Sequence, residues 1–135
     1  MLLKGKNIFV VEDDPINLAV ISSILRAMGA KVTIDLWGDT ATHTLVKAMP
    51  IDILLLDLML PNNLSGYDVF DQVRAVPELK EVPIVAVTAL DPGIGMNKAR
   101  EKGFKGYITK PIRANTFGQY IAAILDGQEV WAEMV

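Results

Sequence analysis

Residues 52–61 read Asp-Ile-Leu-Leu-Leu-Asp-Leu-Met-Leu-Pro (DILLLDLMLP), and this stretch carries most of the information about the fold. The apolar run 53–56 is typical of a strand buried on both faces, as in a parallel sheet covered by helices. The run leads directly to the carboxylate Asp57. A charge at the edge of a hydrophobic core is costly unless a partner compensates it. The stretch therefore predicts a buried strand and raises the question of what compensates Asp57.

On both sides of this stretch, short apolar runs alternate with amphipathic segments. The pattern predicts strands over 7–11, 31–35, 51–57, 82–88 and 106–109, and helices over 15–28, 39–49, 67–76, 96–102 and 115–125. Five strands interleaved with five helices predict an α/β fold, a doubly wound parallel sheet with helices on both faces and right-handed crossovers.

The chain is expected to form one domain over residues 1–126, followed by a C-terminal tail over 127–135. A length of 135 residues is enough for a single hydrophobic core. The tail contains Trp131, for which three interpretations stay open: packing on the domain, association with another chain, or disorder. His43, on the weakly predicted helix over 39–49, is expected to be a surface residue.

Composition excludes several classes of protein. With 13 basic and 16 acidic residues the net charge is -3, and no run of Lys or Arg occurs, so direct nucleic-acid binding is not expected. The absence of cysteine excludes disulfides and thiolate metal sites. Since the sequence shows neither a secretory leader nor an apolar run of membrane-spanning length, the protein is expected to be cytoplasmic and to have no membrane segment.

Polar residues follow four of the five predicted strands. In chain order they are Glu12, Asp13 and Asp14; Asp57; Thr88; and Thr109 and Lys110. Taken singly, each has a structural explanation, such as a helix cap at Asp13, Asp14 or Thr88. The carboxyl ends of parallel strands meet at one edge of the sheet, however, which is where ligands of such folds bind.

Carboxylates gathered at one edge repel one another unless a cation is present. Only oxygen ligands are available here, which favours a hard cation, Mg²⁺ before Ca²⁺. Such a site could handle a phosphoryl group, with Asp57 as the in-line nucleophile, Mg²⁺ and Lys110 neutralising its oxygens, and Thr88 donating a hydrogen bond. On this hypothesis metal and lysine compensate Asp57.

With these residues in place, the chain resembles the receiver domain of two-component response regulators over roughly residues 6 to 126. The resemblance lies in four motifs: VVEDDPIN (10–17), LLLDLMLP (54–61), VAVTA (85–89) and GYITKP (106–111). It implies a flavodoxin-like fold with strand order 2-1-3-4-5. It also implies that Asp57 accepts a phosphoryl group from a phosphohistidine of a sensor histidine kinase or phosphotransfer protein.

The resemblance assigns roles to further residues. Mg²⁺ would be held by Asp13 directly, by Glu12 through water, by Asp57 and by the backbone carbonyl of Met59. Thr88 and Tyr107 would form the switch pair, in which the hydroxyl moves toward the phosphoryl group and the ring turns inward. Lys110 would be aimed at that group by a cis peptide bond to Pro111, and the protein would catalyse only its own phosphorylation and dephosphorylation.

A downstream protein would bind the face formed by the segments over 96–102, 106–109 and 115–125, and a phosphorylation-dependent homodimer is a further expectation left open. Because the chain stops about ten residues after the last predicted helix, the output is expected to be an interaction, unless the sequence is a fragment. Two departures from the family pattern are visible. The loop between Pro61 and Gly66 holds four residues in place of three, and the acidic pair is Glu-Asp in place of Asp-Asp.

Two other functions fit parts of the pattern. A phosphatase of the haloacid dehalogenase type would use an aspartyl-phosphate intermediate, but it needs an acidic residue two positions after its nucleophile, where this chain has Met59. An interaction module that works without phosphorylation would keep the fold but not need the site residues. Met59 and Leu90, each two residues beyond a site residue, suggest a phosphoaspartate that is shielded from water.

Overall fold

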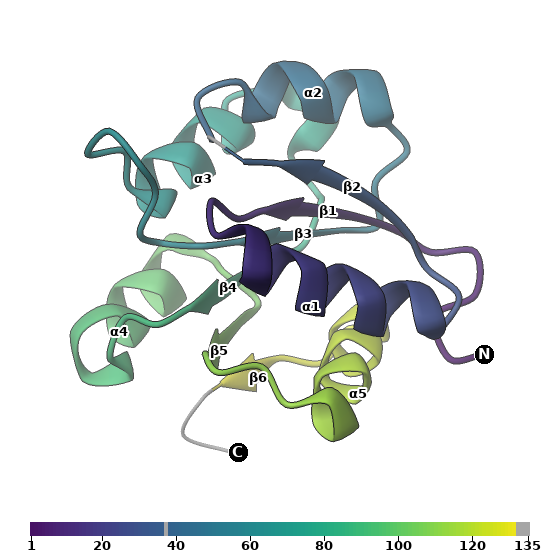
Figure 1. Cartoon of the computed structure of the whole chain (residues 1–135). Helices are drawn as coiled ribbons and strands as arrows, with labels where there is room; N and C mark the ends of the chain where they lie inside the picture. Colours follow the sequence, from purple (N-terminus) through teal and green to yellow (C-terminus); the bar gives the residue numbers. More distant parts are fainter. Residues whose placement is uncertain (37, 132–135) are drawn as a thin grey trace.

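The computed structural model describes residues 1–36 and 38–131, and it shows one sheet with helices packed on both faces (Figure 1). In chain order the elements are β1 (Asn7–Val11), α1 (Pro15–Ala27), β2 (Lys31–Asp35), α2 (Ala41–Ala48), β3 (Ile53–Leu56), α3 (Gly66–Arg74), the 3₁₀ turn η1 (Pro77–Leu79), β4 (Ile84–Thr88), α4 (Pro92–Lys102), β5 (Gly106–Thr109), α5 (Ala114–Leu125) and β6 (Val130–Trp131).

All neighbouring strands pair in parallel, in the order β2-β1-β3-β4-β5-β6. The predicted α/β class and the strand order 2-1-3-4-5 are confirmed. A sixth strand, β6, is not among the predicted elements; it lies within the predicted tail over 127–135, of which residues 132–135 fall outside the described residues, and it extends the sheet beyond β5. The described part of this strand, Val130–Trp131, is too short to show the alternation by which a strand is recognised in a sequence.

The sheet separates the core into two halves. On one face the side chains of Phe9, Leu54 and Leu56 pack with α2, α3 and α4. On the other face those of Ile8 and Leu55 pack with α1 and α5, which lie side by side in Figure 1. All four residues of β3 have no exposed surface, so the expectation of a strand buried on both faces is confirmed.

The helix starts show local capping. Asp14 caps α1, since its Oδ1 accepts a hydrogen bond from the Ile16 N–H at 2.8 Å, and Pro15 takes the first helical position. The start of α4 differs from the prediction, which left residues 90–95 as a connection. Asp91 accepts from the Gly93 N–H at 2.7 Å and the helix begins at Pro92. Two glycines in that first turn lower its helix propensity and hide it in the sequence.

Among the described residues, no helix has the length and apolar content needed to cross a bilayer.

Candidate functional site

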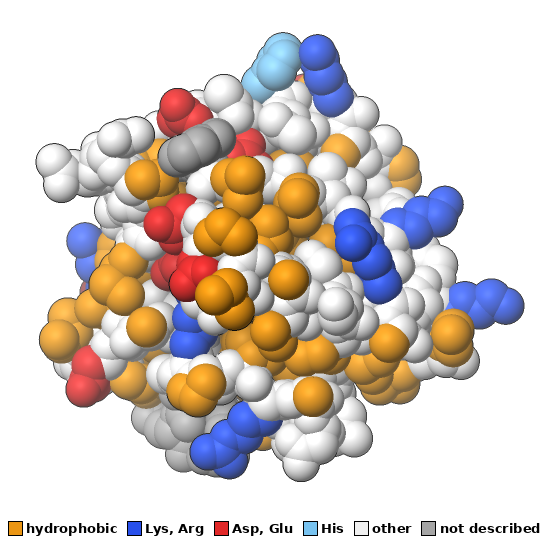
Figure 2. Space-filling model, viewed as in Figure 1, with side chains coloured by type: hydrophobic (Ala, Val, Ile, Leu, Met, Phe, Trp, Pro, Cys, Tyr) orange, Lys and Arg blue, Asp and Glu red, His pale blue; other side chains and the backbone are white. Residues whose placement is uncertain are grey.

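Three carboxylates meet where β1 and β3 end. Glu12 and Asp13 follow β1, Asp57 follows β3, and these strands are neighbours in the sheet. One oxygen from each carboxylate lies within 4.8 Å of the others. Figure 2 shows this acidic cluster on the side where the strand arrows of Figure 1 end, with a basic side chain beside it and apolar side chains around it. The sequence predicts that charged residues gather at this edge of the sheet, and in the structure Glu12, Asp13 and Asp57 lie together there.

Lys110, which follows β5, reaches across to this cluster. Its Nζ lies 2.9 Å from Asp57 Oδ2 and also contacts Glu12 Oε1. The second oxygen of Asp57, Oδ1, accepts a hydrogen bond from the Met59 N–H at 3.1 Å. The Asp57 side chain is only 5% exposed. In this structure an ammonium and a backbone N–H therefore compensate Asp57. The Lys110–Pro111 peptide is cis, as the resemblance implied.

The electrostatics of the cluster favour a further cation. Burial raises the pKa of Glu12, and the charge of Asp57 adds to this, while hydrogen bonding to Lys110 opposes it. Burial lowers the pKa of Lys110, but its hydrogen bonds to the two carboxylates outweigh burial, so that the pKa is raised and the ammonium stays charged. Apart from its contact with Lys110, the buried Glu12 Oε1 has no hydrogen-bond partner. Three carboxylates beside one ammonium carry an excess of negative charge, which suits a hard cation.

Thr88 and Tyr107 are linked through the backbone of Leu90. The Leu90 N–H donates to Thr88 Oγ1 at 3.2 Å, and the Tyr107 hydroxyl donates to the Leu90 carbonyl at 2.8 Å. Both side chains are fully buried. The Tyr107 ring thus lies inside the protein in this structure, and the hydroxyl of Thr88 is engaged with the loop after β4. The sequence carries no signal for Leu90 in this role, because the contacts use backbone atoms.

The loop with the extra residue forms a tight turn. Asn62 and Asn63 both have φ of 60°, a conformation that asparagine tolerates better than most residues. An antiparallel bridge between Met59 and Ser65 closes the loop. Gly66 then packs against the site: a Cβ there would lie 2.3 Å from the Asp57 carbonyl oxygen. Gly66 therefore shapes the site by letting the backbone approach Asp57 closely, whereas the sequence marks it only as the end of a loop.

Tyr67 is a further residue whose role no motif of the sequence indicates. It belongs to α3, and its hydroxyl donates to the Gly95 carbonyl of α4 at 2.9 Å. Lys98 of α4 lies with its Nζ 4.4 Å from the centre of the same ring. Tyr67 therefore joins the helix that begins beside Asp57 to the helix that follows Thr88.

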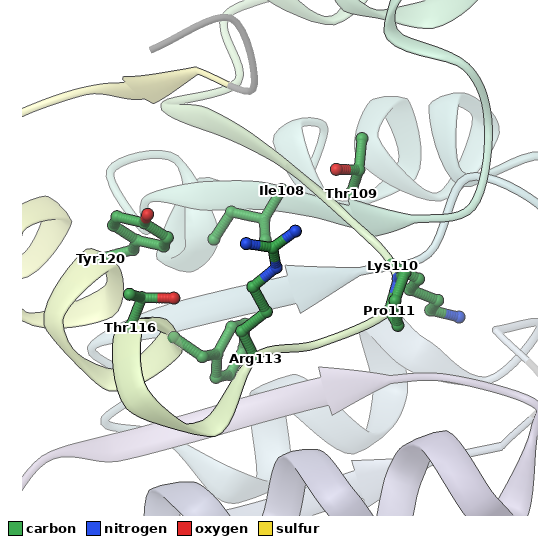
Figure 3. Close-up of a pocket in the computed structure, with 8 residues that line it drawn as sticks. Ile108, Thr109, Lys110, Pro111, Arg113, Thr116 and Tyr120 are labelled. Atoms are coloured by element: carbon green, nitrogen blue, oxygen red, sulfur yellow. The ribbon is translucent and has the colours of Figure 1, made fainter. Parts of the chain in front are cut away.

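A separate cavity of about 220 Å³ lies between β5 and α5. Its lining residues are Ile108, Thr109, Lys110, Pro111, Arg113, Thr116, Phe117 and Tyr120. Figure 3 shows the Lys110 side chain pointing away from Arg113 and Tyr120. Since its Nζ binds Asp57, Lys110 contributes to the acidic cluster with its amino group, and the cavity is not part of that cluster.

The fold and this edge place the chain among flavodoxin-like α/β proteins with an acidic site at the carboxyl ends of β1 and β3. The family model of the response regulator receiver domain matches residues 8–122. The chain belongs to the response regulator receiver domain family, and so to the proteins of two-component signalling.

Similar proteins agree with this assignment. The polar-differentiation response regulator DivK of Brucella ovis is 29% identical over 120 residues, which cover 89% of this chain and 96% of DivK. The solved receiver domain of a sensor histidine kinase from Pseudomonas aeruginosa PAO1 is 32% identical, with a TM-score of 0.78, and the match covers 92% of this chain and 99% of that one. That structure has a magnesium ion coordinated in its active site cleft.

The BeF3-activated DrrB receiver domain, from Thermotoga maritima, is 26% identical with a TM-score of 0.74, and the match covers 90% of this chain and 97% of that one.

Proposed function

We propose that this protein is the phosphoacceptor switch of a two-component phosphorelay in the cytoplasm. It receives a phosphoryl group on Asp57 from a phosphohistidine of a sensor histidine kinase or phosphotransfer protein, and its conformation then controls a protein partner. The observation that carries the proposal is the contact of Lys110 Nζ with Asp57 Oδ2, at 2.9 Å, inside a cluster of three carboxylates.

The acidic cluster fits Mg²⁺. Glu12, Asp13 and Asp57 bring carboxylate oxygens together, and apart from its contact with Lys110, Glu12 Oε1 lacks a hydrogen-bond partner. The backbone carbonyl of Met59 remains the predicted further ligand. When bound, the ion would supply positive charge to the oxygens of a phosphoryl group. Magnesium in the cleft of the Pseudomonas relative supports this assignment.

Asp57, Lys110 and Thr88 each take part in the proposed transfer. An Asp57 carboxylate oxygen attacks phosphorus while the bond from phosphorus to the donor imidazole nitrogen breaks, and the imidazole leaves with that bonding pair. Lys110 remains charged beside the reacting oxygens and stabilises their negative charge. Thr88 exchanges its hydrogen bond with the Leu90 N–H for one donated to the phosphoryl group.

The protein is proposed to catalyse only its own phosphorylation and dephosphorylation. A phosphatase acting on outside substrates needs a proton donor beside the leaving group, and the position two residues after Asp57 is Met59, which cannot supply one. This feature favours a switch over the dehalogenase-type alternative.

Exposed apolar side chains support two partner surfaces. Ile16 and Met59, 75% and 47% exposed, stand on the segments that follow the acidic residues, and they suit contact with the phosphoryl donor. We propose that the downstream protein binds the face of α4, β5 and α5, and Ile94, 73% exposed, gives α4 an exposed apolar side chain. A phosphorylation-dependent homodimer through that face is the alternative use.

Incubation with acetyl phosphate and Mg²⁺, followed by intact mass measurement, tests the function. We expect one phosphoryl adduct per chain, absent from Asp57→Asn, which keeps the shape of the side chain but not its charge. Release of phosphate over many turnovers would support the phosphatase alternative. A chain that remains unmodified under these conditions would support the interaction module that works without phosphorylation.

Met59 is expected to slow the loss of the phosphoryl group. Its large apolar side chain stands two residues from Asp57 and would hinder an attacking water, whereas asparagine would admit and orient one. Decay of the adduct, followed by mass after removal of acetyl phosphate, should accelerate about tenfold in Met59→Asn, which corresponds to about 1.4 kcal/mol in the barrier. A lifetime of seconds that the substitution leaves unchanged would contradict this.

A further inference from the structure

The sixth strand pairs with the edge of β5 and buries two side chains, Val130 and Trp131. β6 pairs Gly106 with Val130 and Tyr107 with Trp131, and the Val130 N–H donates to the Lys105 carbonyl at 3.3 Å. Val130 packs into the core half formed with α1 and α5, and Trp131 into the half formed with α2, α3 and α4. Figure 1 shows β6 as the outermost strand, next to β5.

Trp131 lies on the same side of the sheet as the predicted switch residue. Register partners in paired strands point to the same face, so the Trp131 and Tyr107 side chains are neighbours in one cluster. The guanidinium of Arg100, on α4, lies 4.4 Å from the centre of the indole ring, and the indole N–H donates to Glu129 at 3.0 Å. Trp131 is only 5% exposed.

Contacts lead from Thr88, at the end of β4, to this strand. The Leu90 N–H is bound to Thr88, and the Leu90 carbonyl is bound to Tyr107. If Thr88 turns toward a phosphoryl group, Leu90 loses one of these two bonds, and the loop that leads into α4 is released. Movement of Tyr107 and α4 would then alter both surfaces on which Trp131 rests.

We propose that Glu129–Trp131 is an intramolecular cover over the edge of β5 and the adjoining side of α4, and that phosphorylation of Asp57 releases it. This inference rests on the proposed function. Within the described residues β6 is a two-residue strand at the edge of the sheet, and a short edge element of this kind opens locally more readily than the core strands. Release exposes the unpaired edge of β5 together with the apolar site of Trp131, which a partner can occupy by adding a strand of its own.

The cover can be tested on the unmodified chain. Amide hydrogen exchange, read by mass spectrometry on peptides that contain residues 129–131 and 105–107, is compared with and without acetyl phosphate and Mg²⁺. We expect exchange in both segments to become about tenfold faster in the phosphorylated chain, a typical size for coupling between two sites. Asp57→Asn should show no acceleration.

Intact mass measured on the same samples separates the two claims. If the adduct forms and exchange at 129–131 keeps its rate, the cover is wrong while the proposed function stands. If no adduct forms, the proposed function fails and the cover fails with it.

Reciprocity supplies a second test. If activation weakens the cover, then weakening the cover must favour activation by the same factor. Trp131→Ala should bind beryllofluoride, a phosphoryl mimic, about tenfold more tightly, whereas His43→Ala, on the exposed surface of α2, should bind it as the unmodified chain does. Equal affinity of a folded Trp131→Ala would overturn the proposal. The exchange experiment decides the matter even if this variant does not fold.

Discussion

At the scale of single residues, Asp13 and Asp14 have the same side chain but different roles. Asp14 caps α1 and accepts hydrogen bonds from backbone N–H groups of its first turn. Asp13, one residue earlier, turns its carboxylate toward Glu12 and Asp57. The sequence left open which of the two caps the helix, because both are good N-cap residues. Only the direction of the backbone after β1 distinguishes them.

This difference predicts that substitutions at the two positions change the stabilisation by Mg²⁺ differently. At a concentration 100 times its dissociation constant, a ligand stabilises the native state by about 2.7 kcal/mol. Asp13→Asn should lose most of this Mg²⁺-dependent gain, because it removes a charged ligand. Asp14→Asn should keep it, because asparagine caps a helix nearly as well as aspartate. Urea unfolding with Mg²⁺ and with EDTA measures both; equal gains in the two variants would argue against Asp13 as a ligand.

Tyr107 shows what burial does to a titratable group. Burial raises the pKa of its phenol well above the usual range, and electrostatic interaction with Tyr67, Asp91 and Asp57 adds to the effect. Its hydroxyl has a partner in the Leu90 carbonyl, so the neutral form is satisfied. The native protein therefore keeps Tyr107 neutral at a pH where the unfolded chain would ionise it.

The sign of the resulting pH dependence follows from linkage. Below about pH 10, the ordinary phenol pKa, both states are neutral and the contribution of Tyr107 is fully present. Above it, the unfolded state loses a proton that the native state retains, and stability falls by up to about 1.4 kcal/mol per pH unit. Urea unfolding between about pH 9 and 11 should show this fall, and Tyr107→Phe should show a shallower one. Identical slopes would mean that Tyr107 ionises normally.

At the scale of elements, side-chain contacts with neighbouring elements help to hold α4 in place. Its buried residues are small or flexible: Gly95, Met96 and Ala99. Three of its cations reach aromatic rings of other elements, Lys98 at Tyr67, Arg100 at Trp131 and Lys102 at Phe70. A helix held in this way can shift without opening the core, which suits an element that responds to the acidic site.

Tyr67→Phe should loosen α4 specifically. It removes the hydroxyl that donates to the Gly95 carbonyl and leaves the ring in place, at a cost of about 1 kcal/mol in the free energy of unfolding. Exchange of the α4 amides should accelerate more than exchange in α1.

Tyr120→Phe is the matched control, because the Tyr120 hydroxyl makes no hydrogen bond to the described residues. An equal loss of stability in both variants would count against a specific role for Tyr67.

For the molecule as a whole, β6 changes the outline of the fold. The crossover through α5 adds a sixth parallel strand, and the β5 edge, together with the adjoining side of α4, is partly covered by the chain itself. Gly106 makes this possible, since a Cβ there would lie 2.7 Å from the Val130 carbonyl oxygen. Of the three interpretations of Trp131, the structure supports packing on the domain.

Trp131 should therefore matter for stability. Truncating a buried tryptophan costs about 3 kcal/mol or somewhat more, and Trp131→Ala should reach this value in urea unfolding because the side chain is 95% removed from solvent. His43→Ala should cost less than about 0.5 kcal/mol, as expected for an exposed residue. A loss below about 1 kcal/mol for Trp131→Ala would show that β6 is not packed in solution.

The sequence alone was sufficient for the alternation of strands and helices, the order of the five central strands through its family resemblance, and the residues at the strand ends. These features depend on side-chain types, namely apolar runs such as 53–56 and polar residues such as Asp57 and Lys110. The early start of α4 and the strand β6 were missed, because glycines and a two-residue strand give little periodic signal.

Folding in three dimensions settled the contacts that depend on backbone atoms or on long-range pairing. Leu90 connects Thr88 to Tyr107 through its N–H and carbonyl groups, and Gly66 meets the Asp57 carbonyl where no side chain would fit. Every residue has the same backbone groups, so the sequence cannot mark which of them will be used. Trp131 likewise could be placed only once β6 had paired with β5, because burial there depends on residues distant in the chain.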